Sequence, residues 1–163
     1  MTIDSPESRV SDFDFIIGSW NVHHRRLDER LSGCTHWTEF EGTSTTRKVL
    51  GEAGNLEDNV LAMPDETYHA VALRSFDTHT QEWSIWWLDG RNPGRLDPPV
   101  VGKFANGTGL FFANDVLNGR PIRVRFTWSI PEPDRPRWEQ AFSDDDGASW
   151  ETNWTMTFER PLR

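Results

Sequence analysis

The sequence has few of the features that would place a protein outside the cell, in a membrane or on nucleic acid. Its single cysteine, Cys34, cannot form an internal disulfide, and the start MTIDSPESRV has no apolar secretory core. No segment approaches the roughly 18 consecutive apolar residues of a membrane-spanning helix. With 26 acidic residues against 17 basic ones, the net charge of -9 opposes binding to a phosphate backbone. We therefore predict a cytoplasmic protein without a membrane or nucleic-acid partner.

Sequence signatures of common enzymes and metal sites are also missing. The chain contains no G-x-S-x-G elbow, Walker loop, dinucleotide-binding fingerprint, H-E-x-x-H or C-x-x-C motif. His23 and His24 are neighbours, so in a regular strand they point to opposite faces and cannot bind one metal together. The acidic run Asp144–Asp146 lacks the spread of oxygen ligands that a Ca²⁺ site needs. We therefore predict neither a metal nor a cofactor.

Aromatic side chains, by contrast, are abundant. The 163 residues include 9 Trp and 10 Phe against 1 Tyr, and large rings favour half-buried β-strands. Turn signals such as Ser32-Gly33, Asn92-Pro93-Gly94 and Asn118-Gly119 recur at short intervals. The segments between them are rich in Trp, Phe, Val, Ile and Thr. This pattern predicts an all-β protein built as one antiparallel meander.

A single domain over residues 1–163 accounts for the chain, because no linker or break in composition divides it. About 8–10 strands would leave sheet edges exposed, and closure into a barrel removes those edges. Residues 1–9 are predicted to form a flexible tail. A short helix after this tail, with Ser11 as N-cap and with Phe13 and Ile16 as apolar contacts, is predicted to plug one end of the barrel.

Three hairpins predict which side chains point inward. The type I′ signal Asn118-Gly119 puts Asp115 on the same face as Ile122 and Phe126. A five-residue loop after Phe76 would place His69 beside Asp89. Pairing Phe142 with Trp150 gathers one apolar face, which consists of Trp138, Gln140, Phe142, Trp150, Thr152, Trp154, Met156 and Phe158.

The segment GSWNVHHRRL carries four consecutive cationic residues. If Ser32-Gly33 is a two-residue turn, Arg26 faces Glu39 and His24 faces Glu41 on the inner side. One interpretation is ordinary surface stabilisation of about 0.2–1 kcal/mol per pair. The other is that these pairs line a cavity and bind a polar ligand group. A single β-bulge would reverse the faces and turn His23 inward.

Gly18-Ser19-Trp20, at the start of the first predicted strand, resembles the G-x-W signature of the calycin superfamily, which includes lipocalins and fatty-acid-binding proteins. The whole chain is similar to a group of bacterial calycin-like domains that begin FDFIIGSWNVHHRRL and end SWETNWTMTFER. The resemblance implies a calycin-like barrel in which Arg160 packs on Trp20 at the closed end. Lipocalins are usually exported and disulfide-bonded, whereas this sequence predicts neither export nor a disulfide.

A second resemblance is local. Ser143-x-Asp145-x-Gly147-x-x-Trp150 resembles the Asp-box hairpin of sialidases, where it lies away from the active site. We expect a structural role, in which Asp145 accepts hydrogen bonds from turn amides, Gly147 takes a positive φ and Trp150 packs beneath the turn.

The leading hypothesis is an intracellular binding barrel for a small aromatic or amphipathic molecule. The alternative is a cofactor-free enzyme of the same fold, an isomerase or cyclase in which His24 transfers protons and Glu41 orients it. A third hypothesis is an interaction module with a solid core, and a homodimer is left open. A cavity of about 300 Å³ or more would favour a ligand. The predicted ligand-binding residues are His24, Arg26, Glu39, Glu41, His69, Trp87, Asp115, Phe126, Trp128, Gln140 and Trp154.

Overall fold

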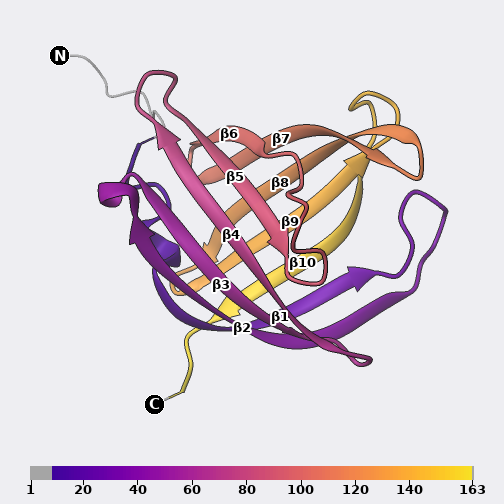
Figure 1. Ribbon diagram of the computed structural model, residues 1–163, viewed down its shortest axis with the longest axis horizontal. Helices are drawn as coiled ribbons and strands as arrows, with labels where there is room; N and C mark the ends of the chain where they lie inside the picture. The colour runs from indigo at the N-terminus through magenta and orange to yellow at the C-terminus, as the bar shows by residue number, and fades with distance from the viewer. Residues whose placement is uncertain (1–8, 163) are drawn as a thin grey trace.

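The computed structural model describes residues 9–162, which form one closed antiparallel barrel of ten strands (Figure 1). Each strand pairs with its neighbours in sequence, and β1 pairs with β10 to close the sheet. The strands are β1 (Gly18–Leu27), β2 (Trp37–Val49), β3 (Gly54–Ala62), β4 (Thr67–Asp77), β5 (Glu82–Asp89), β6 (Val100–Ala105), β7 (Thr108–Leu117), β8 (Arg120–Glu132), β9 (Arg135–Ser143) and β10 (Glu151–Glu159). The predicted all-β meander closed into a barrel is confirmed.

The helical content of the described chain is limited to 3₁₀ turns. The predicted plug is η1 (Asp14–Ile16), and η2 (Leu50–Glu52) links β2 to β3. Ser11 does not cap η1 with its side chain, because the turn begins later, with Phe13 at the N-cap position. No helix within residues 9–162 is long and apolar enough to cross a membrane. Of the predicted tail, residues 1–8 lie outside the described residues.

The plug closes its end of the barrel with aromatic packing. Phe13 and Ile16 are almost completely buried, because the short turn drives both into the barrel interior. The ring of Phe13 meets the rings of Trp83 and Phe104 edge to face, with centroids 4.9 Å apart in each case. Such edge-to-face contacts add to the burial energy of the rings. The core of the closed half is therefore built around Phe13.

A buried ion pair lies next to this plug. Arg74 and Glu57, which are 2% and 3% exposed, form a salt bridge inside the barrel. Arg74 also donates a hydrogen bond of 2.8 Å from Nη1 to Oδ1 of Asn55. Its guanidinium carbon lies 5.0 Å from the ring centre of Phe13 and 5.1 Å from that of Trp128. Trp128, a predicted ligand-binding residue, is therefore part of the closed-end core.

Trp20 and Arg160 stack at the closed end, as the calycin resemblance implies. The guanidinium carbon of Arg160 lies 3.5 Å from the ring centre of Trp20, and its Nη1 and Nη2 donate hydrogen bonds to the carbonyls of Ser19 and Ile17. Gly18 makes room for this contact, because a Cβ there would lie 2.6 Å from Nη1 of Arg160. The φ of +111° at Gly18 also favours glycine.

Replacing Arg160 with Ala is expected to lower the free energy of unfolding by about 1 kcal/mol or more, because the cation–π contact and both backbone hydrogen bonds are lost. Urea denaturation measures the change. Arg135→Ala is the control, since Arg135 is exposed and makes only surface ion pairs with Glu132 and Glu159. Equal, negligible changes for both variants would refute the role of Arg160.

The hairpin at Asn118-Gly119 has the predicted register. Both turn residues have positive φ, 51° for Asn118 and 78° for Gly119, as a type I′ turn requires. Asp115 lies opposite Ile122, and Phe126 lies opposite an inward phenylalanine of β7. The inner faces of β7 and β8 are therefore those that the sequence predicts.

The connection between β1 and β2 is longer than predicted. Residues 28–36 join the two strands, and the backbone N–H of Asp28 donates a 2.9 Å hydrogen bond to the carbonyl of His36. Ser32-Gly33 lies inside this loop and does not form a two-residue turn. The turn therefore does not set the register, which differs by one residue from the prediction.

This slip of one residue moves two glutamates to the outside. Glu41 lies opposite His23, and the side chains of Glu39 and Glu41 are 59% and 72% exposed. The predicted pairing of His24 with Glu41 and of Arg26 with Glu39 is wrong, because alternation puts both glutamates on the outer face. Both instead contact His23, at 3.0 Å for Glu39 and 2.6 Å for Glu41. His24 and Arg26 do point inward.

A β-bulge at Asn153 changes the inner face of β10. The register with β9 shifts at this residue. Asn153, which is not part of the predicted apolar face, is fully buried and accepts a 2.8 Å hydrogen bond from Gln140. Trp150, predicted inward, lies on the outer side with its ring centre 4.5 Å from the guanidinium carbon of Arg125. The prediction of the inner face is correct from Trp154 onward. Before Trp154 it is wrong, because the extra residue of the bulge reverses the alternation of inward and outward side chains there.

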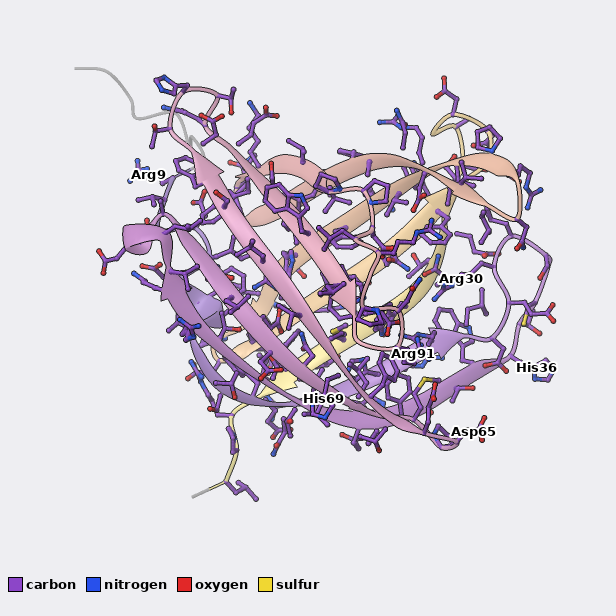
Figure 2. The ribbon with its side chains drawn as sticks, viewed as in Figure 1. Arg9, Arg30, His36, Asp65, His69 and Arg91 are labelled. Atoms are coloured by element: carbon purple, nitrogen blue, oxygen red, sulfur yellow. The ribbon has the colours of Figure 1, made fainter. Side chains whose placement is uncertain are left out.

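The hairpin between β4 and β5 has a shorter loop than predicted. Residues 78–81 form the loop, so Ala70, and not His69, lies opposite Asp89. His69 is exposed on the outer face and can be followed in Figure 2. Trp87, opposite Ala72, points inward.

The turn around Asp145 has the predicted local chemistry. Asp145 accepts hydrogen bonds from the side chain and backbone N–H of Ser149 and from the side chain of Ser143. These bonds, led by the one from the Ser149 side chain, lower the pKa of Asp145 to about 2. Gly147 has φ +89° and lies beside Trp150. The likeness to an Asp-box remains a resemblance of sequence.

Candidate ligand-binding cavity

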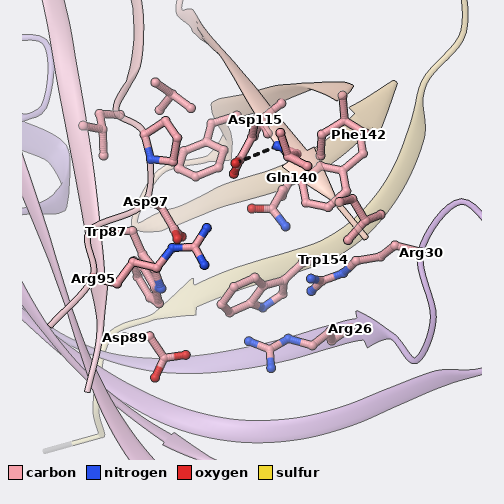
Figure 3. Close-up of a pocket in the computed structure, with 18 of the residues that line it drawn as sticks. Arg26, Arg30, Trp87, Asp89, Arg95, Asp97, Asp115, Gln140, Phe142 and Trp154 are labelled. Carbon is pink, nitrogen blue, oxygen red and sulfur yellow. Dashed lines mark hydrogen bonds between the residues drawn. The ribbon is translucent and has the colours of Figure 1, made fainter. Parts of the chain in front are cut away.

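The end of the barrel opposite the plug contains a cavity of about 340 Å³ (Figure 3). Three tryptophans shape its aromatic wall. The ring of Trp154 packs at right angles against Trp87 and nearly so against Trp138, with centroids 5.7 and 5.1 Å apart. Further apolar lining comes from inward positions of β5 to β9, among them Ile85, Val100, Ile122, Val124, Phe126 and Phe142. Alternation of strand residues thus supplies a pocket that suits a flat apolar molecule.

One side of the cavity is formed by a loop. β5 pairs with β6 only over Trp83–Ile85, and the rest of β5 is flanked by the loop of residues 90–99. This loop contains three prolines, which lack the N–H groups needed for a regular ladder. Contacts that attach its later part to β5 include an isolated bridge between Leu88 and Leu96 and a 3.2 Å hydrogen bond from Asp97 N–H to the carbonyl of Trp87.

Arg91 fixes the start of this loop to the barrel. Its guanidinium donates hydrogen bonds to Asp89 and, at 2.8 Å, to Glu66, and it lies 3.6 Å from the ring centre of Tyr68. Partial burial would raise the pKa of Asp89, but the hydrogen bonds from Arg91 outweigh it and lower that pKa. The bond with Asp89 raises the pKa of Arg91. Both groups are therefore charged and paired.

Arg26 and Arg30 also line the cavity and, like Arg95, have no carboxylate within salt-bridge distance among residues 9–162. Arg26 donates a 2.8 Å hydrogen bond to the hydroxyl of Tyr68 and lies 3.9 Å from the ring centre of Trp154. Its Nε has no hydrogen-bond partner within the described part of the chain. Arg30 lies 5.5 Å from the ring centre of Phe142. Burial and the charge of Arg26 lower the pKa of Arg30 to about 10, so Arg30 remains charged at neutral pH.

Two aspartates lie across the cavity from these arginines (Figure 3). Asp115 accepts a 2.8 Å hydrogen bond from the N–H of Val116. Asp97, at the mouth, loses part of its hydration while remaining open to solvent on one side. This desolvation, followed by the charge of Asp115, raises the pKa of Asp97.

Six of the predicted ligand-binding residues line the cavity, namely Arg26, Trp87, Asp115, Phe126, Gln140 and Trp154. The other five do not. Glu39, Glu41 and His69 lie on the outer face, and Trp128 belongs to the closed-end core. The register slips described above explain the first three.

His24, the fifth, lies behind the cavity wall. Its Nδ1 accepts a 3.1 Å hydrogen bond from the indole N–H of Trp154, and its ring stacks on Phe40 with centroids 4.5 Å apart. Burial, and then the charge of Arg26, lower the pKa of His24 to about 3. A neutral imidazole without a carboxylate beside it cannot perform the predicted acid-base role near neutral pH. His24 instead positions Trp154.

Sequence reasoning missed the charged residues that complete the cavity, which are Arg30, Asp89, Arg91, Arg95 and Asp97. Four of them lie at the end of β5 or in the loop of residues 90–99, and Arg30 lies in the loop of residues 28–36. Strand alternation says nothing about side chains in such loops. The only available signal was the density of charge next to the Trp-rich segment of β5. Figure 2 shows Arg30 and Arg91 at the same end of the barrel.

The architecture is a closed antiparallel barrel of ten strands with a plugged end and a cavity at the other end. Among solved structures, the chain is similar to the S-type phycobiliprotein lyase CPES from Guillardia theta, with a TM-score of 0.62 and 11% sequence identity. The match covers 93% of this chain and 91% of the lyase chain, so the likeness extends over the whole barrel. No protein-family model and no curated protein matches the sequence.

Proposed function

We propose that the barrel is a cytoplasmic binding protein for a small amphipathic molecule with an aromatic body. The observation that carries this proposal is the cavity of about 340 Å³ with three tryptophans on one wall and arginines at its edge. This volume exceeds the roughly 300 Å³ at which pockets hold drug-sized ligands. A solid-core interaction module has no comparable support, and the likeness to the lyase supports the fold alone.

The enzyme alternative receives no support from the residues first assigned to it. His24 and Glu41 lie on opposite faces of the sheet, so they cannot act as an acid-base pair. The cavity contains arginine and aspartate side chains, and this arrangement suits the binding of a charged ligand better than acid-base catalysis. Binding is therefore the function that the geometry supports best.

A fluorescent neutral probe, N-phenyl-1-naphthylamine, tests the proposal. We expect saturable binding that quenches tryptophan emission, because the probe enters beside Trp154. Val124→Trp fills the cavity from β8 and is expected to weaken binding at least about tenfold, since overpacking excludes the ligand.

Thr127→Trp is the matched control, because Thr127 lies on the outer side of the same strand and should leave the affinity within about twofold. Native mass spectrometry of protein purified from its source would look for a bound molecule. If the probe does not bind and no molecule co-purifies, the proposed function is wrong.

A further inference from the structure

We propose that the ligand is an aromatic molecule with an anionic group at one end and a cationic group at the other. The anion contacts Arg26 and Arg30, and the cation contacts Asp97 and Asp115. This inference rests on the proposed function, because it concerns the same cavity, and it names the charge pattern that the cavity selects.

The cationic side is built to receive an anion. Arg26 points inward from β1 and is held by Tyr68 and by the face of Trp154, so its guanidinium is preorganised. Its buried Nε has no hydrogen-bond partner among residues 9–162, whereas buried donors are normally satisfied. Glu151 of β10 is near enough for its charge to act on Arg30. Its carboxylate accepts a 2.7 Å hydrogen bond from the N–H of Leu31 and makes no salt bridge with Arg30. Two adjacent guanidinium groups match the geometry of a carboxylate or a similar oxyanion.

The acidic side has the complementary arrangement. Asp97 and Asp115 both line the cavity, where burial and then the repelling charge of Asp115 raise the pKa of Asp97. The cation whose charge acts most on Asp97 is Arg95, yet neither aspartate forms a salt bridge with any of residues 9–162. A bound ammonium or other basic nitrogen would relieve the repulsion between the two carboxylates.

The separation of the two charge pairs is the central observation. The charges of Arg30 and Asp97 are close enough to influence each other, yet the two side chains do not form an ion pair. They instead lie on opposite sides of the cavity, with Trp154 between them in the view of Figure 3. A ligand with a flat body and opposite charges at its ends would satisfy all four side chains.

A matched set of four biphenyl compounds tests this inference on the intact protein. The set is 4′-(aminomethyl)biphenyl-4-carboxylate, biphenyl-4-carboxylate, biphenyl-4-ylmethanamine and biphenyl, each titrated by tryptophan quenching and by displacement of N-phenyl-1-naphthylamine. We expect the amphoteric compound to bind at least about tenfold tighter than biphenyl, and tighter than either compound with one charge, because each new charge-assisted hydrogen bond adds affinity.

Two variants separate the ends of the site. Arg30→Gln should weaken the carboxylate and the amphoteric compound about five- to tenfold and spare the amine, whereas Asp97→Asn should weaken the amine and the amphoteric compound and spare the carboxylate. The controls are Arg25→Gln and Asp58→Asn, which change exposed outward residues of β1 and β3 and should leave all four affinities within about twofold.

The results distinguish the proposed charge pattern of the ligand from the proposed binding function of the cavity. Equal affinities for all four compounds, with the neutral probe still bound, would overturn the charge inference and leave the binding cavity intact. A carboxylate that binds as well as the amphoteric compound would overturn the assignment of Asp97 and Asp115. Failure of every compound and of the neutral probe would overturn both the inference and the proposed function.

Discussion

Replacing Arg74 with Met is expected to lower the free energy of unfolding by about 3–5 kcal/mol, because the change leaves the carboxylate of Glu57 buried without its cation. Both side chains are nearly inaccessible to solvent. Glu57 would keep its hydrogen bond from Ser44, but one hydroxyl does not replace the charge of Arg74. Urea denaturation monitored by tryptophan fluorescence measures the loss as a lower midpoint.

Two comparisons show whether the missing charge is the cause. The double variant Arg74→Met with Glu57→Leu removes both charges and should recover most of the stability, since apolar replacement of a buried pair is often neutral. Arg135→Met breaks only exposed ion pairs and should cost less than about 1 kcal/mol. If the double variant is as unstable as the single one, the loss comes from packing and not from the unpaired carboxylate.

Acid is expected to destabilise the protein through His24. The pKa of this imidazole is about 3 in the folded protein, because burial and then Arg26 oppose its charge, against an unfolded value of about 6.5. Between these values the unfolded chain binds the extra proton, so stability falls as the pH falls below 6.5. The loss is up to about 1.4 kcal/mol for each pH unit.

His24→Gln removes the titrating group while keeping an acceptor for the indole of Trp154. The stability of this variant should therefore fall less steeply than that of the natural protein between pH 6.5 and 4.5, by roughly 2–3 kcal/mol over the interval. Denaturation midpoints at several pH values measure the difference. Parallel pH profiles for the two proteins would contradict the buried, neutral state of His24.

His23→Gln is the control with the opposite sign. Hydrogen bonds to Glu41 and then Glu39 raise the pKa of His23 in the folded protein. Its contribution to stability is therefore present below the unfolded pKa and is lost as the pH rises. Because the side chain is 43% exposed, solvent screening keeps this effect small.

Much of the fold can be predicted from sequence because local chemistry determines it. Asn118-Gly119 specifies a type I′ turn by its backbone preferences alone, and the register of β7 with β8 follows from that turn. Closure of the sheet follows from the number of strands and the cost of free edges. The contact of Trp20 with Arg160 was predicted from the calycin resemblance. The glycine at position 18 leaves the space that the arginine side chain occupies.

The cavity was only half predictable, and the errors have identifiable causes. Because residues 28–36 form a longer loop than the predicted two-residue turn, the predicted register of β1 with β2 is wrong by one residue. The prediction therefore placed Glu39 and Glu41 inside the barrel, whereas they lie outside. The bulge at Asn153 could not be predicted, because no glycine or proline marks it in the sequence. Asp97 reaches the cavity from a loop, where no periodicity predicts direction.

The short pairing between β5 and β6 gives the barrel one weak seam. Three residue pairs join these strands, compared with nine between β3 and β4, and beyond these three pairs the proline-containing loop of residues 90–99 replaces β6 along that edge of β5. Local opening follows the regions with the fewest backbone hydrogen bonds. Amide hydrogens of Trp86–Asp89 that point away from β4 should therefore exchange faster than those at the centre of β3. A ligand could enter sideways through this seam, while the β1–β10 closure and the plug remain intact.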